Sequence, residues 1–217
     1  GILVMVIAVV FSRVHLPEIK HEETEEDRIK DTRIMKLFKH HPMFVFGLFS
    51  LLAYEIAEIS INSYFINFVT GQGWMDDNSA SMVLTVALGF FMVGRFLGSW
   101  IMRRIPAERM LMYCSLGSVS CLGVVLLDIG HWSMYALIAN YLFEAIMFPT
   151  IFSLSLQGLG NLTKSASSLL MMTPIGGCFF LLMGYVADQT NLVVPFLIPF
   201  IGYFIVLLYA SELSRKS

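Results

Sequence analysis

The stretch MFVFGLFSLLAYEIAEISINSYFINFVT, residues 43–70, decides the fold. It exceeds the roughly 20 apolar residues that a helix needs to cross a hydrocarbon core about 30 Å thick. Glu55, Glu58 and Asn62 are spaced i, i+3 and i+7 in it, so they share one face of an otherwise apolar helix. The stretch therefore predicts a membrane-spanning helix that carries a polar stripe.

Five further apolar runs follow the first and are bounded by charged residues, glycine or proline. They cover residues 80–102, 110–127, 132–156, 167–187 and 192–210. We expect six transmembrane helices within residues 43–210, and thus an all-α polytopic membrane protein. Residues 1–12 are also apolar, and we interpret them as the end of a truncated transmembrane helix. Residues 13–42 are predicted to be a charged cytoplasmic linker, and residues 211–217 a cytoplasmic tail.

The composition agrees with a membrane protein and excludes other classes. The chain is 57% hydrophobic and 14% charged, against roughly 45–50% and about 25% in soluble domains. A net charge of -2 excludes binding of nucleic acid through a basic surface. Cys114, Cys121 and Cys178 lie in apolar runs and are expected to be packing thiols. His40 and His41 precede Pro42 without a further ligand at suitable spacing, so we predict no metal site and no cofactor.

Lysine and arginine lie almost entirely in alternate connections. They occur in residues 13–42 and 103–109, at Lys164 and in the C-terminal tail, while Arg95 is the one within a span. The other connections contain acidic residues but no lysine or arginine. By the positive-inside rule the basic connections are cytoplasmic, and so is the C-terminus. We expect a multi-pass protein of the cell inner (plasma) membrane.

Four ionisable residues fall inside the predicted spans: Glu55, Glu58, Arg95 and Glu144. A charged residue at the centre of a span raises the free energy of membrane insertion by roughly 2.5–3.5 kcal/mol, so we expect each of these residues to have a structural or functional role. Asn140 and Glu144, spaced i, i+4, form a second polar stripe, and two facing stripes would line a cavity. Because the two carboxyls of the first stripe are one turn apart, we expect at least one to be protonatable near neutral pH.

Purely structural roles remain open for several of these polar residues. Arg95 is close enough to the cytoplasmic face to extend to it, or to tie helices together. Asn62 and Asn140 could form hydrogen bonds between helices instead of binding a substrate. Pro149 and Pro174, the second followed by Gly176 and Gly177, are expected to weaken their helices, as in a bundle that moves.

Several stretches of the chain are similar to a known family. They are YEIAEISINSY (54–64), MVGRFLGSWIMRRI (92–105), IMFPTIFSLSLQGLG (146–160), TKSASSLLMMTPIGG (163–177) and MGYVAD (183–188). Residues 43–210 resemble the sugar/proton symporters of the major facilitator superfamily, in the fucose/glucose/galactose transporter group. The segment FPTIFSL resembles a signature of that group. Gly94, Arg95, Gly98, Arg103 and Arg104 resemble the broader facilitator loop motif.

The resemblance implies two six-helix halves, alternating access between them and a sugar site at the midplane. This chain would be the C-terminal six-helix bundle plus the end of the preceding helix, with the N-terminal half missing. It implies a monosaccharide and a proton as substrates and the lipid bilayer as surroundings. Glu58 corresponds to an acid that the family commonly carries in its seventh helix, and Asn62, Ser63 and Asn67 line the same end of that helix.

The chain departs from the family at two places. The run CFFLL between Gly177 and Met183 lacks the proline that relatives usually have there, and Glu144 stands where a smaller or neutral residue is expected. Three alternatives to a sugar symporter remain: a fragment without transport activity of its own, a facilitator of another solute, and an intramembrane enzyme. The last has no supporting motif, such as H-E-x-x-H, in the sequence.

Overall fold

The computed structural model describes residue 35 and residues 37–216. The predictions for residues 1–12, and those for the linker before residue 35, lie outside the described residues. Within the described part the helices are joined by short turns and there is no strand. The elements are α3 (Pro42–Gly71), α4 (Asp77–Ile101), α5 (Ala107–Leu126), α6 (His131–Glu144), α7 (Met147–Leu156), η1 (Gly160–Leu162), α8 (Thr163–Leu170), η2 (Thr173–Phe179), α9 (Phe180–Gln189), η3 (Val194–Phe196) and α10 (Leu197–Lys216).

Six helical segments in the described part are long and apolar enough to cross a membrane, as predicted. They are Pro42–Gly71, Asp77–Ile101, Ala107–Leu126, His131–Leu156, Gly160–Gln189 and Val194–Arg215. Pro42 occupies the first turn of α3, where a missing backbone N–H costs no helical hydrogen bond.

Two of the six segments are broken inside. The fourth changes from α6 to α7 at Ala145 and Ile146, and the fifth changes to a 3₁₀-helix over Thr173–Phe179. Both breaks lie next to a proline that the sequence marks as a weak point, Pro149 in one and Pro174 in the other. Proline removes a backbone donor and crowds the preceding turn, which accounts for both places.

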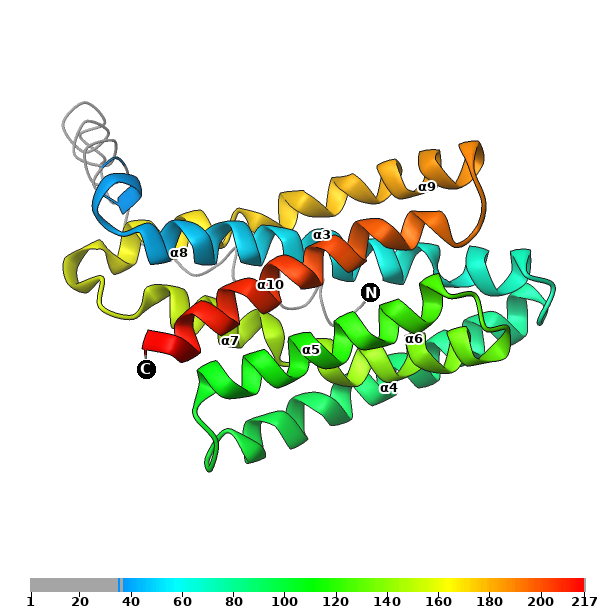
Figure 1. Ribbon diagram of the computed structural model, residues 1–217, viewed down its shortest axis with the longest axis horizontal. Coiled ribbons are helices and arrows are strands. Elements are labelled where there is room, and N and C mark those ends of the chain that lie inside the picture. The colour runs from blue at the N-terminus through cyan, green and yellow to red at the C-terminus, as the bar shows by residue number, and fades with distance from the viewer. Residues whose placement is uncertain (1–34, 36, 217) are drawn as a thin grey trace, which may run out of the picture.

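The helices run along a common direction (Figure 1). α3 and α10 lie side by side through the middle of the molecule, with α9 along one side and α4, α5 and α6 along the other. α10 packs on α3 and α5, and α6 packs on α4 and α5.

The connections gather at two opposite ends of the bundle. The beginning of α3, the α4–α5 turn, the α7–α8 turn and the C-terminal end of α10 lie at one end (left in Figure 1). The α3–α4, α5–α6 and α9–α10 turns lie at the other end. The basic connections therefore share one end, and the acidic connections share the other.

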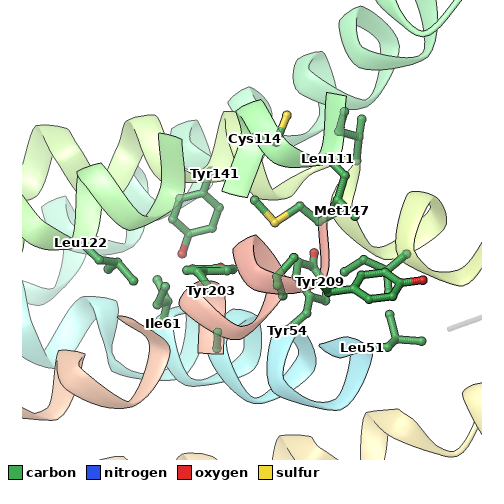
Figure 2. Packing of buried hydrophobic residues seen from close by; sticks show 14 of the residues in the cluster. Leu51, Tyr54, Ile61, Leu111, Cys114, Leu122, Tyr141, Met147, Tyr203 and Tyr209 are labelled. Atoms are coloured by element: carbon green, nitrogen blue, oxygen red, sulfur yellow. The ribbon is translucent and has the colours of Figure 1, made fainter. Parts of the chain in front are cut away.

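Tyrosine rings fill much of the space between the helices (Figure 2). Tyr54 of α3, Tyr141 of α6 and Tyr203 of α10 are completely buried and point into one region of the core. The ring centroids of Tyr54 and Tyr203 lie 6.3 Å apart. A tyrosine contributes a large apolar ring and a hydroxyl that needs a hydrogen-bond partner when it is buried, so this core is partly polar.

Two glycines permit the closest helix contacts. A Cβ atom at Gly202 of α10 would lie 2.7 Å from the backbone oxygen of Ala53 in α3. A Cβ atom at Gly94 of α4 would lie 2.7 Å from the backbone oxygen of Leu142 in α6. Small residues at such positions let membrane helices approach closely.

Candidate functional site

The carboxyl of Glu144 lies at the centre of the bundle, at the last residue of α6. Glu144 and Asn140 are both 0% exposed. Asn140 Nδ2 donates a hydrogen bond of 2.8 Å to Glu144 Oε2, and the Tyr203 hydroxyl from α10 donates to the same oxygen. Asn140 Nδ2 also lies 3.5 Å from the Tyr203 hydroxyl, so one polar cluster joins α6 to α10.

Several atoms of this cluster have no partner. Glu144 Oε1, Asn140 Oδ1 and the Tyr141 hydroxyl are buried without a hydrogen bond. The part of the chain that the structure describes also provides no ion pair for the Glu144 carboxyl. Burying a charged carboxylate without a cation costs free energy in a medium of low dielectric constant, which favours the protonated form of the carboxyl. The unpaired Glu144 Oε1 can hold that proton.

The polar stripe of α3 is next to this cluster. The Tyr54 hydroxyl donates a hydrogen bond of 3.0 Å to the backbone oxygen of Glu144. Glu58 is half-buried and close to both Tyr54 and Arg95, while Glu55 is buried. The two predicted stripes are thus brought together, with Tyr54 between them. Asn140 and Glu144 are completely buried, so among the described residues they do not line an open cavity.

Asn62 and Asn67 continue along α3 but differ in their surroundings. Asn62 is half-buried, and its Oδ1 atom is buried without a partner. Asn67 is exposed and lies with Ser63 and Tyr64 on one wall of a pocket between α3 and α9. The opposite wall includes Tyr185 and Asp188, and the pocket has a volume of about 410 Å³.

The break in the fourth span is held by side chains of two other helices. Pro149 has no N–H, so the backbone oxygen of Ala145 lacks its usual helical donor. Arg95 Nε from α4 donates a hydrogen bond of 3.1 Å to this oxygen. The neighbouring backbone oxygen, that of Glu144, accepts the hydrogen bond from Tyr54. Of the roles open to Arg95, this contact supports the one in which it ties helices together.

The remaining predicted structural or gating residues fall in three places. Gly94 and Gly98 of α4 face Ala145 and Ile146 at the break. Pro174, Gly176 and Gly177 form the 3₁₀ segment η2, whose two glycines face Leu52, Ile56 and Ile59 of α3. Arg103 and Arg104 are exposed in the α4–α5 turn.

Sequence reasoning missed Tyr203 as a member of the central cluster and Asp188 as a member of the outer pocket. Tyr203 lies in an apolar run, where a tyrosine gives no sign that its hydroxyl meets a carboxyl 59 positions away. Asp188 belongs to a connection without lysine or arginine, and this pattern predicts only its side of the membrane. That end also carries the exposed Asn67, and an exposed amide on a membrane helix is a signal that could have linked the two.

Comparisons with known proteins bear on this site and fold. The family model described as Major Facilitator Superfamily matches residues 1–180. A glucose/galactose transporter of Brucella abortus biovar 1 (strain 9-941) is 31% identical over 214 residues, which are 97% of this chain and 51% of the relative. An L-fucose-proton symporter of Escherichia coli (strain K12) is 30% identical over 167 residues, 76% of this chain and 38% of the relative.

A solved structure of similar fold is the crystal structure of FucP, a transporter of that superfamily, in the outward conformation. The TM-score is 0.81 at 25% sequence identity, over 97% of this chain and 52% of that chain. These relatives are named as transporters or symporters, not as enzymes. The chain spans about half the length of the curated glucose/galactose transporters that it matches.

Proposed function

Because the chain belongs to the major facilitator superfamily, we propose that it forms the C-terminal half of a transporter that moves a monosaccharide by alternating access. The partner half is an N-terminal six-helix bundle, in keeping with the 51% of the glucose/galactose transporter's length that this chain covers. The names of the relatives, which specify glucose, galactose and fucose, support a hexose or deoxyhexose as the substrate.

The observation that best supports a sugar substrate is the pocket between α3 and α9. Its walls offer the amide of Asn67, the carboxyl of Asp188 and the hydroxyl of Ser63. Tyr64 and Tyr185 add aromatic rings with polar tips. Sugar hydroxyls both donate and accept hydrogen bonds, while the C–H faces of the ring pack on aromatic groups, so this mixture suits a monosaccharide.

We propose that transport is coupled to protons and that the carboxyls of Glu58 and Glu144 participate. Glu144 has two donors on one oxygen and none on the other, and no cation compensates it in the described part of the chain. Binding or loss of a proton there changes the hydrogen bonding that joins α6 to α10. A proton shifts the balance between outward-open and inward-open states only if it binds one of them more tightly, and such a change in bonding supplies that difference.

We place the protein in the cell inner (plasma) membrane with the C-terminus in the cytoplasm. The support is the gathering of the basic connections at one end of the bundle. The α3–α9 pocket then opens toward the outside of the cell, because Asp188 lies at the opposite, acidic end.

The test is uptake and counterflow by the complete transporter in proteoliposomes, with fucose, glucose, galactose and mannose as the panel. We expect one or two of these sugars to exchange, uptake to fall when a protonophore is added, and the interior to acidify when sugar is supplied. Asn67→Ala and Asp188→Asn should each raise KM, with Glu108→Gln at the basic end as the control. Exchange of none of the sugars would refute a sugar substrate, and uptake indifferent to the protonophore would refute proton coupling.

A further inference from the structure

A groove between α4 and α5 belongs to neither the central polar cluster nor the α3–α9 pocket. These helices are consecutive in the chain, but α4 packs mainly on α6 and α3, and α5 mainly on α6 and α10. The space between them has a volume of about 200 Å³ and is floored by α6. Leu97, Gly98 and Ile101 line one side, Met110 and Tyr113 the other, and Phe143 the floor.

The groove is a hydrocarbon surface that opens sideways from the bundle. Its lining is almost entirely apolar, so it cannot satisfy the hydroxyls of a sugar. Gly98 contributes no side chain, whereas Leu97 and Tyr113 stand at the rims and are 48% and 54% exposed. A rim of this composition on two membrane helices can take in an alkyl chain where it meets lipid tails.

Positive charge collects where the groove ends. Ile101 and Met110 lie at its end toward the α4–α5 turn, and the segment MRRIPAER, residues 102–109, connects them. Arg103, Arg104 and Arg109 in this segment are exposed, and within the described residues none of them forms an ion pair. The guanidinium carbon of Arg104 lies 5.5 Å from the centre of the Trp100 ring. Tryptophan is enriched at the level of lipid headgroups, so we expect these arginines at the depth of the lipid phosphates.

We propose that this groove and turn bind an anionic phospholipid of the bilayer. One acyl chain lies in the groove between α4 and α5, and the arginines of the turn hold the phosphate and the anionic headgroup. The planar guanidinium matches two phosphate oxygens at once, and basic pockets between membrane helices on the cytoplasmic side are suited to anionic headgroups. The segment holds three arginines and one glutamate, Glu108, so it is positively charged on balance. This charge and the apolar groove beside it complement the two ends of an anionic lipid, whereas a zwitterionic lipid offsets its phosphate with its own cation and brings no net negative charge.

The lipid also has a consequence for the bundle. The groove is bounded by Gly94 and Ile146, which flank the break that Arg95 stabilises. An acyl chain that fills the groove packs against this break from the lipid side. It therefore stabilises the contact of α4 with α6.

The experiment is native mass spectrometry of the complete transporter in detergent, titrated with palmitoyl-oleoyl phosphatidylglycerol or with the matching phosphatidylcholine. We expect saturable binding of phosphatidylglycerol and much weaker binding of phosphatidylcholine. Arg103→Gln, Arg104→Gln and Arg109→Gln combined should weaken phosphatidylglycerol binding by roughly 100-fold, given about 1 kcal/mol for each basic residue at an anionic surface. A matched variant removes three charges at the same end of the bundle, Lys164→Gln, Arg215→Gln and Lys216→Gln, and should bind as the wild type does.

Two further comparisons separate the groove from the charge. Dihexanoyl phosphatidylglycerol, which has the same headgroup on short chains, should bind more weakly than the long-chain lipid, and Leu97→Gln should reduce long-chain binding only. Should the triple variant misfold, the three single variants take its place, each with a partial loss. Equal binding by the arginine variants and the wild type, or equal binding of the two long-chain lipids, would overturn the proposal.

Discussion

The hydrogen bonds of the buried Glu144 carboxyl predict how substitutions there change the stability of the protein. Replacement by alanine removes the acceptor of both Asn140 Nδ2 and the Tyr203 hydroxyl. Each buried polar group left unpaired costs about 1–3 kcal/mol. Glu144→Ala should therefore lower the melting midpoint of the detergent-solubilised protein strongly.

Glu144→Gln separates charge from hydrogen bonding at the same place. The glutamine retains one acceptor oxygen. Its amide can donate to Asn140 Oδ1 or to the Tyr141 hydroxyl, both of which lack a partner in the wild type. We expect this variant to melt close to the wild type but to lose proton-coupled uptake. A melting midpoint as low as that of Glu144→Ala would contradict the hydrogen bonding, and unchanged sugar-driven acidification would contradict the role in coupling.

Arg95 and Pro149 form a pair whose energetic coupling can be measured. Arg95 donates to the backbone oxygen that Pro149 leaves without a donor. Arg95→Ala should cost about 1.5–3 kcal/mol, the usual range for a hydrogen bond to a charged group. In a Pro149→Ala background the alanine N–H can serve the same oxygen, so the cost of Arg95→Ala should fall. A double-mutant cycle on unfolding gives the coupling, and additive effects would show that the two residues act independently.

At the scale of helices, the contact of α3 with α10 depends on Gly202. A Cβ atom there would approach the backbone oxygen of Ala53, which cannot move aside as a side chain can. We expect Gly202→Ala to destabilise the bundle by about 1–3 kcal/mol through overpacking. Gly123 in α5 is the matched control, because a Cβ atom there would meet nothing within 4 Å. Gly123→Ala should leave stability unchanged or raise it by up to about 1 kcal/mol through helix propensity. Equal loss in both variants would mean that the α3–α10 contact is not the cause.

Hydropathy predicted all six spans because a bilayer demands long apolar helices and leaves few alternatives. The positions of the two breaks were also foreseeable, since proline removes a fixed donor. The side chains that hold the first break could not be foreseen. Arg95 and Tyr54 reach Ala145 and Glu144 from other helices, and the rotation of one helix about its axis relative to another depends on packing. For the same reason the sequence paired Asn140 with Glu144 but could not find Tyr203.

In the whole molecule the basic connections lie at one end of the bundle and the acidic connections at the other. This separation is the basis of the proposed orientation. The α4–α5 turn, the α7–α8 turn and the end of α10 share one end, and the α9–α10 turn lies at the other (Figure 1). In the proposed orientation the α3–α9 pocket faces the outside of the cell, from which the proposed sugar would enter. The arginine turn then faces the cytoplasmic leaflet, whose anionic lipids attract basic residues.

Labelling of single cysteines in intact cells tests the orientation. In a background with Cys114→Ala, Cys121→Ala and Cys178→Ala, Asn191→Cys in the α9–α10 turn should react with a membrane-impermeant maleimide added outside. Ser214→Cys near the end of α10 should react only after the membrane is permeabilised. The reverse pattern would put the arginine turn outside and the α3–α9 pocket inside. Because the arginine turn and the pocket lie at opposite ends of one bundle, one pair of variants fixes the side of the membrane for both sites.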